Sequence, residues 1–195
     1  MNNYEYIIAS LPLLREVGTD IPDTDTILAD IREQLSARDR AELDFLLSSY
    51  EPDSLNAEFY NKAEKSRNSF IRSFFAIDLG IRNAKVEYLN RTLGRPEGTD
   101  MVLPDPEREA AEFEQKAEVD AILQGTDIIA REKGLDDYYW KVVDNLTVMD
   151  VFDLDVVLAF VVKLKLAERW LRLDEATGRE LFRKLVKEIK ENTKI

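Results

Sequence analysis

Residues 74–94 read FFAIDLGIRNAKVEYLNRTLG, and their pattern indicates a helical fold. Its apolar and small residues recur in steps of three and four, which is the period of one helix face. The same spacing extends back to Phe59. The pattern therefore predicts one long helix over residues 54–93, about 60 Å long at 1.5 Å per residue. Gly94 is expected to end it, and Gly80 marks a bend or a close crossing within it.

The composition of the whole chain also favours helices. Its 195 residues include only 7 Gly and 6 Pro, and Ala, Leu, Glu, Lys and Arg are abundant. No alternation of strands and helices and no series of hairpin turns is visible. We therefore expect an all-α, multi-helix bundle forming a single domain over residues 1–195. A connector at 95–106 separates its N-terminal and C-terminal helical halves.

The flanking segments divide into shorter elements. Residues 4–14 fit either a small β element or a first helix, and periodicity does not decide between them. Asp23 and Ser36 stand where helix N-caps are expected, and Gly134 stands where a residue after a helix end is expected. Further helices are predicted over residues 26–35, 36–50, 136–145, 155–173 and 174–192.

The segment 155–173, DVVLAFVVKLKLAERWLRL, begins with the most apolar run of the chain. As a helix, its seven apolar residues 156–162 span about 10 Å, against about 30 Å of membrane hydrocarbon. This run therefore does not cross a membrane. In the second half, Glu168 and Arg172 are spaced for an ion pair one helical turn apart.

Four aromatic and basic side chains are candidate contacts to a partner protein. Residues 138–140 are Tyr, Tyr and Trp, and consecutive helical residues point about 100° apart, so they cannot all face one core. Arg169 and Trp170 fall on the polar side of the 155–173 helix. The candidates are Tyr139, Trp140, Arg169 and Trp170.

The chain has neither Cys nor His. Disulfides, zinc and haem sites, Cys nucleophiles and His general bases are thereby excluded, and no Gly-Lys-Ser/Thr phosphate loop occurs. Glu109 and Glu112 resemble the first acidic pair of all-α, magnesium-dependent nucleotide pyrophosphohydrolases, but the second pair is missing, because Leu135 stands three residues after Glu132. We expect no catalytic residue, cofactor or metal, and we retain this hydrolase as an alternative.

The formal net charge of −12 disfavours binding to nucleic acid, which requires a basic surface. The charge is also unevenly placed. Residues 97–137 contain 13 acidic and 4 basic side chains, whereas residues 163–195 contain 10 basic and 6 acidic ones. This asymmetry fits a protein with oriented partners, although solvated helix faces explain it equally well. The lack of Cys suits a reducing cytoplasm.

Three stretches resemble a bacterial family of uncharacterised proteins whose genes are found with those of V-type ATPases in Bacteroidetes and relatives. They are residues 4–12, 74–94 and 156–173. That family is in turn similar to the central-stalk adaptor of V/A-type ATPases, the component designated C (d in eukaryotes). The resemblance to this ATPase adaptor covers only a repeated helical unit.

Six positions carry the resemblance to the ATPase adaptor. That protein has an Asp, a nearby Asn and an Arg at the end of one helix, and a closing signature of an apolar run with an aromatic residue, then Lys, then Glu, Leu and Arg. The Asp and Asn are five residues apart here, whereas the ATPase adaptor usually has three. The matching positions are Asp78, Asn83, Arg91, Phe160, Glu168 and Arg172.

The resemblance implies a non-catalytic, all-helical adaptor that links the rotor shaft of a V-type ATPase to its membrane proteolipid ring. Its partners would be the central-stalk subunits and the ring, and it would be cytoplasmic, held at the inner membrane through the complex. The other alternative is a helical interaction protein unrelated to ATPases, forming a homodimer through the long helix.

Overall fold

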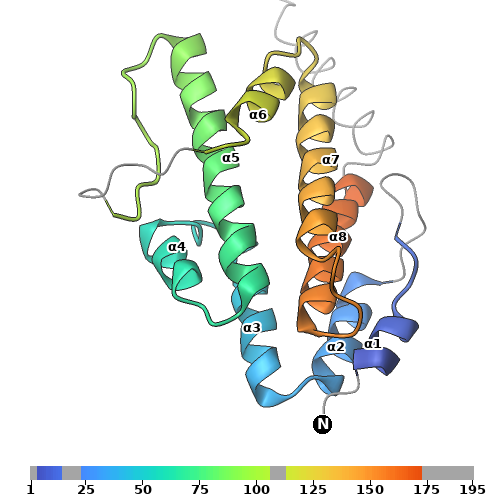
Figure 1. Ribbon diagram of the computed structural model, residues 1–195. Coiled ribbons are helices and arrows are strands. Elements are labelled where there is room, and N and C mark those ends of the chain that lie inside the picture. The colour runs from blue at the N-terminus through green and yellow to red at the C-terminus, as the bar shows by residue number, and fades with distance from the viewer. Residues whose placement is uncertain (1–3, 15–22, 106–112, 173–195) are drawn as a thin grey trace, which may run out of the picture.

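The computed structural model describes residues 4–14, 23–105 and 113–172, with side chains up to residue 170 (Figure 1). This part of the chain is helical, without a strand, which confirms the all-α class. Its helices are α1 (Tyr4–Ser10), α2 (Thr24–Gln34), α3 (Ala37–Ser48), α4 (Ala57–Glu64), α5 (Ser69–Leu93), α6 (Lys116–Leu123), α7 (Ile128–Leu146) and α8 (Leu154–Arg172).

The N-terminal segment is a helix and not a β element. Ile7 of α1 is buried and belongs to the main apolar core, and α1 packs against α8. The apolar residues of this short segment thus find a helical partner far away in the sequence. No local pattern signals that partner, which is why periodicity alone left the choice open.

The predicted long helix over residues 54–93 is wrong in one respect, because α4 and α5 are separate helices. The Ser66 hydroxyl accepts a hydrogen bond from the Asn68 backbone N–H at 3.0 Å, and the Asn68 side chain caps α5 by accepting from the Ile71 N–H at 2.8 Å. Short polar side chains compete with helical hydrogen bonding in this way. The apolar spacing continues across the break because both helices bury their faces in one core.

The predicted stop and caps around these helices are confirmed. Gly94 ends α5 in the left-handed conformation, with φ 64°, and its N–H bonds to the Arg91 carbonyl. Asp23 caps α2 and Ser36 caps α3 through their side chains. Residues 95–105 form no helix, as expected for the connector.

The prediction for Gly80 is confirmed, and the prediction for Gly134 is wrong. At Gly80, in the middle of α5, an added Cβ would lie 2.7 Å from Cγ of Phe113, so this is the expected close crossing. Gly134 does not follow a helix end. It lies inside α7, where it lets Ile122 of α6 approach the helix backbone.

Two apolar cores share the long helices α5 and α7, which stand side by side in Figure 1. We call the larger one the lower core; it gathers buried residues from α1 to α5, α7 and α8. The upper core lies between α5, α6 and α7, and it is built from seven buried residues: Ile81, Ala84, Val119, Leu123, Leu135, Tyr138 and Val142. Tyr139 and Leu146 pack against both cores and join them.

The apolar start of the 155–173 segment is a core helix. Val157, Leu158, Val161 and Val162 of α8 are at most 1% exposed. Among the described residues, no helix has the length and apolarity that a membrane crossing requires. The predicted helix over 174–192 and the acidic pair Glu109 and Glu112 lie outside the described residues.

Candidate functional site

Asp78 in the middle of α5 is the centre of a buried polar cluster. Only 4% of the residue is exposed. Its Oδ2 accepts hydrogen bonds from the Tyr60 hydroxyl of α4 at 2.7 Å and from Arg82 Nε at 2.8 Å. Its Oδ1 accepts one from the Tyr139 hydroxyl of α7 at 2.7 Å. A single carboxylate therefore ties α4, α5 and α7 together, and we call this group the Asp78 cluster.

The electrostatics of this cluster keep both tyrosines neutral. Burial, and next the negative charge of Asp78, raise the pKa of Tyr60 well above its ordinary value. The same two causes raise the pKa of Tyr139. Both hydroxyls therefore remain donors to the carboxylate throughout the physiological pH range.

Asn83, the second family-motif position, holds the connector against α5. Its amide donates to the Val102 carbonyl and accepts from the Val102 N–H, each at 2.9 Å. Two more asparagines bind the connector through their side-chain amides. Asn90 of α5 donates to the Thr99 carbonyl at 2.7 Å, and Asn61 of α4 donates to the Pro104 carbonyl at 2.9 Å. The connector thus follows a defined path although it has no helix of its own.

Arg91, the third position, faces α6. Its Nη2 lies 3.6 Å from Oδ1 of Asp120, and Lys116 bridges Glu87 of α5 and Asp120 at 2.7 and 3.4 Å. Asp78, Asn83 and Arg91 therefore point to three different neighbours and do not meet in one pocket. What they share is that each fastens another element to α5.

The C-terminal motif positions lie on α8. Phe160 is partly buried against the lower core. Glu168 pairs with Lys165 at 2.9 Å, one turn before it. The side chain of Arg172 lies outside the described side chains, so its predicted pairing with Glu168 stays a prediction.

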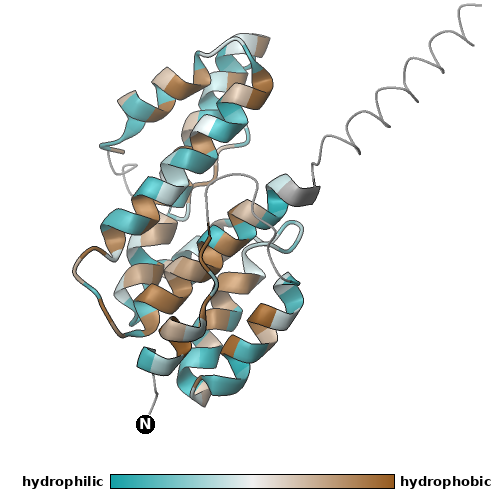
Figure 2. Cartoon of the chain, turned by 90° about the vertical axis from the view of Figure 1, so that its right-hand side faces the viewer, coloured by the Kyte–Doolittle hydropathy of each residue, from teal (hydrophilic) through white to brown (hydrophobic). Residues whose placement is uncertain are grey.

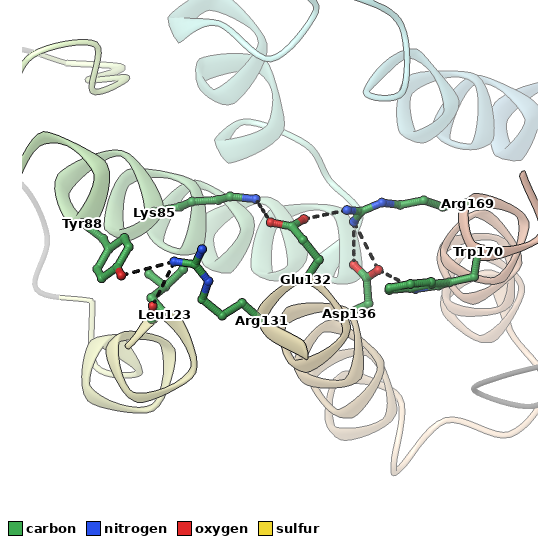
Figure 3. A network of polar contacts seen from close by, with 8 residues as sticks. All are labelled: Lys85, Tyr88, Leu123, Arg131, Glu132, Asp136, Arg169 and Trp170. Carbon is green, nitrogen blue, oxygen red and sulfur yellow. Dashed lines mark hydrogen bonds and ion pairs between the residues drawn. The ribbon is translucent and has the colours of Figure 1, made fainter. Parts of the chain in front are cut away.

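A chain of charged groups connects α5, α7 and α8 (Figure 3). Lys85 Nζ of α5 lies 2.6 Å from Glu132 of α7, whose other oxygen is 2.6 Å from Arg169 of α8. Arg169 also donates to both oxygens of Asp136 at 3.0 and 3.2 Å, and Trp170 Nε1 donates to Asp136 at 2.8 Å. We call these five residues the inter-helix network.

The two carboxylates of this network respond differently to their surroundings. Burial would raise the pKa of Glu132, but the hydrogen bonds and charges of Lys85 and Arg169 outweigh it and lower the pKa. At Asp136 burial prevails and raises the pKa, although Arg169 and Trp170 oppose it. Neither residue was predicted to join helices. Their spacing of four, which places two carboxylates on one helix face, was the available signal.

All four candidate partner contacts make contacts within the chain. Tyr139 belongs to the Asp78 cluster, and Arg169 and Trp170 turn towards α7 instead of pointing outward. Trp140 lies under the Lys163 ammonium group, which is 5.0 Å from the ring centre. Whether these residues also contact a partner stays a prediction.

The loop 147–153 between α7 and α8 was not predicted as a functional surface. Its large apolar side chains face solvent: Val148 is 75% exposed, Met149 87%, Val151 64% and Phe152 53%. The loop projects from the left side of the molecule in Figure 2, where it is coloured mostly brown. Exposed apolar groups this concentrated are characteristic of contact surfaces.

In the described part of the chain, no group of three or more acidic side chains is arranged to hold a metal ion. Several acidic residues there instead form ion pairs between helices, namely Glu87, Asp120, Glu132 and Asp136.

Comparison with known protein families places most of the chain in one of them. The profile of a family described as "Protein of unknown function (DUF2764)" matches residues 51–193. The chain belongs to this family. The matched region contains the Asp78 cluster, the connector, the inter-helix network and the loop 147–153, whereas α1 to α3 precede it. No curated protein and no solved structure matches the chain.

Proposed function

We propose that this DUF2764 protein is a non-catalytic helical adaptor of a V-type ATPase, similar in role to the central-stalk adaptor of V/A-type ATPases. It links the rotor shaft to the membrane proteolipid ring and lies at the inner membrane through that complex. The main support for the proposal is that the three motif residues on α5 each contact a different neighbouring element. Asp78, Asn83 and Arg91 fasten α5 to α4 and α7, to the connector and to α6.

This use of polar groups suits an adaptor that passes force between two partners. Hydrogen bonds to charged groups are directional, and a satisfied buried cluster favours one arrangement of the helices. The inter-helix network extends the same connection from α5 through α7 to α8. A group of helices joined by such side-chain contacts keeps its arrangement when force acts on its two ends.

The polar groups of the Asp78 cluster are poorly suited to catalysis. Both oxygens of Asp78 are already occupied by donors, and both tyrosines are held neutral. A carboxylate that acts as a general base must lie within hydrogen-bond reach of a substrate proton. The buried Asp78 does not meet that requirement, which supports a structural role for the motif.

Affinity purification from the producing cell tests the proposal. The tagged full-length protein, solubilised with its membrane complexes, is expected to bring down central-stalk subunits and the proteolipid ring. The untagged protein in the same cell is the control. If the tagged protein is recovered in good yield without any ATPase component, the adaptor role is contradicted.

A second candidate is a helical interaction protein unrelated to ATPases. The exposed apolar loop 147–153 favours it, because that surface indicates a protein partner without naming one. The same purification separates the two candidates, since the second predicts other partners or a homodimer.

A further inference from the structure

The loop 147–153 differs from the other exposed apolar positions in the part of the chain that the structure describes. Its four large apolar side chains stand within five consecutive residues, whereas the others occur singly or in pairs on separate elements. Ile128 and Ile129 at the start of α7, which are 67% and 69% exposed, form the nearest equivalent. Single exposed apolar residues are ordinary, but a concentrated group is not.

Hydrogen bonds at both ends of the loop hold its backbone in place. The Asp150 N–H donates to the Thr147 carbonyl at 3.0 Å, and the Thr147 hydroxyl donates to the Val143 carbonyl at 3.0 Å. On the other side, Asp153 accepts from the Val156 N–H at 3.2 Å at the start of α8. Leu146 and Leu154 anchor the two ends in the lower core. A backbone that is already held in place loses little entropy when a partner binds.

The charge along the loop is entirely negative. Residues 144–155 contain four Asp and no Lys or Arg. Asp144 pairs with Lys163, whereas no ion pair within the described part of the chain neutralises Asp150, Asp153 or Asp155. Burial, and next the charges of Asp153 and Asp155, raise the pKa of Asp150.

We propose that the loop 147–153 inserts into an apolar groove bordered by Lys or Arg side chains on another protein. The inference deepens the adaptor proposal and rests on it, because the partner is then a component of the ATPase. The apolar side chains supply the buried contact, and the carboxylates that lack an ion pair select a partner with a basic rim. An anionic membrane surface would repel the same carboxylates, so the occupant is a protein.

Two matched variants of the full-length tagged protein test the inference. Met149→Ser with Phe152→Ser removes the two largest side chains of the loop, and Ile128→Ser with Ile129→Ser removes an equally exposed apolar pair elsewhere on the same helix hairpin. All four positions are exposed, so both variants should fold with melting temperatures close to that of the unchanged protein.

The loop variant is expected to recover at least roughly tenfold less ATPase, and the Ile128/Ile129 variant an unchanged amount. Asp150→Lys tests the charge separately and spares Asp153, which caps α8. It is expected to weaken recovery at low salt and to lose that effect at high salt. If the loop variant and Asp150→Lys both recover ATPase like the unchanged protein, the docking inference is overturned while the adaptor role stands.

Three other outcomes also overturn the inference. If the unchanged protein recovers no ATPase component, the adaptor role fails and the docking inference fails with it. If light scattering shows that the loop variant only loses self-association, the occupant is a second copy. If the unchanged protein floats with phosphatidylglycerol vesicles and the loop variant does not, the occupant is a lipid surface.

Discussion

The lower and upper cores of this helical molecule are held together by different forces. In the lower core the Phe59 and Phe75 rings meet edge to face at 4.8 Å, and Phe45 stacks on Phe59 at 4.7 Å. The upper core is smaller, and ion pairs border it, including Lys85 with Glu132 and Lys116 with Glu87. The lower core is thus stabilised mainly by apolar burial, whereas ion pairs between charged side chains also stabilise the upper core at its border.

This difference predicts how each half responds to solution conditions. Burial of apolar surface is insensitive to moderate salt and to pH, whereas partly exposed ion pairs weaken in salt and at acid pH. The Asp78 cluster lies where the halves meet, because Tyr60 belongs to the lower core and Tyr139 packs against both. In salt or at acid pH, the upper core should therefore unfold before the lower core. The Asp78 cluster, which joins the two cores, should determine whether the lower core unfolds with it.

The largest expected effect is loss of a ring from the lower core. Phe75 is 1% exposed and contacts Phe45, Phe59 and Phe74. Phe75→Ala should lower the free energy of unfolding by about 3–5 kcal/mol, because it leaves a cavity among rigid rings. Leu123→Ala in the upper core should cost less, about 2–3 kcal/mol. Urea unfolding of both variants measures the difference, and an equal or larger cost for Leu123→Ala would contradict the contrast between the cores.

The next effect concerns the Asp78 cluster. Asp78→Asn keeps the shape of the side chain, but its amide group cannot accept a hydrogen bond at both ends, so one buried donor loses its acceptor. We expect a loss of about 2 kcal/mol in the free energy of unfolding. Asp44→Asn, which changes an exposed carboxylate paired with Arg32, is the matched control and should cost less than about 1 kcal/mol. Similar losses of unfolding free energy for both variants would show that the hydrogen bonds of Asp78 stabilise the fold no more than an exposed ion pair does.

Gly80 tests the close crossing at the edge of the upper core. Gly80→Ala should destabilise the protein by about 1–2 kcal/mol, because the new methyl group would overlap the Phe113 ring, although Ala favours a helix more than Gly does. Phe113→Leu with Gly80→Ala should recover part of that loss. Thermal unfolding of the single and double variants gives the coupling energy. If Gly80→Ala is stabilising, the ring does not pack on α5 as described.

The smallest effect is electrostatic and belongs to the upper half. The pKa of Glu132 is lower in the folded protein than its ordinary value of 4.5, so its stabilising contribution is present above pH 4.5 and is lost as the pH falls through the folded pKa. Glu132→Gln should therefore cost about 0.5–1 kcal/mol at pH 7 and low salt, and nearly nothing at acid pH. Unfolding curves at several pH values and salt concentrations measure this. A loss that stays constant with pH would show that the charge is not responsible.

Much of the fold could be predicted because each helix buries one continuous face. The apolar spacing predicted the helical region that contains α4 and α5 and the helix α8, and cap residues predicted the starts of α2 and α3. The break between α4 and α5 was hidden, since Asn68 interrupts the backbone hydrogen bonds without interrupting the apolar period. Gly134 was misplaced for the opposite reason: close packing against Ile122, and not a helix end, requires its small size.

The functional residues could be predicted only in part. The family resemblance pointed to Asp78 and Asn83, but their partners, Tyr60 and the backbone of Val102, come from other elements and are joined only by tertiary packing. Arg169 was expected on an outward face because its partner Asp136 lies 33 residues away on α7. The exposure of Met149 and Phe152 was equally hidden, since an apolar loop and an apolar core segment have the same composition.

The most direct test of the central claim is the reciprocal purification of the ATPase. A tag on the catalytic head, in the cell that makes this protein, should recover the protein in a fixed ratio to the central-stalk subunits, as measured by quantitative mass spectrometry of the intact complex. We predict a constant stoichiometric ratio through successive purification steps. Loss of the protein while the shaft and the proteolipid ring remain joined would contradict the proposed adaptor role.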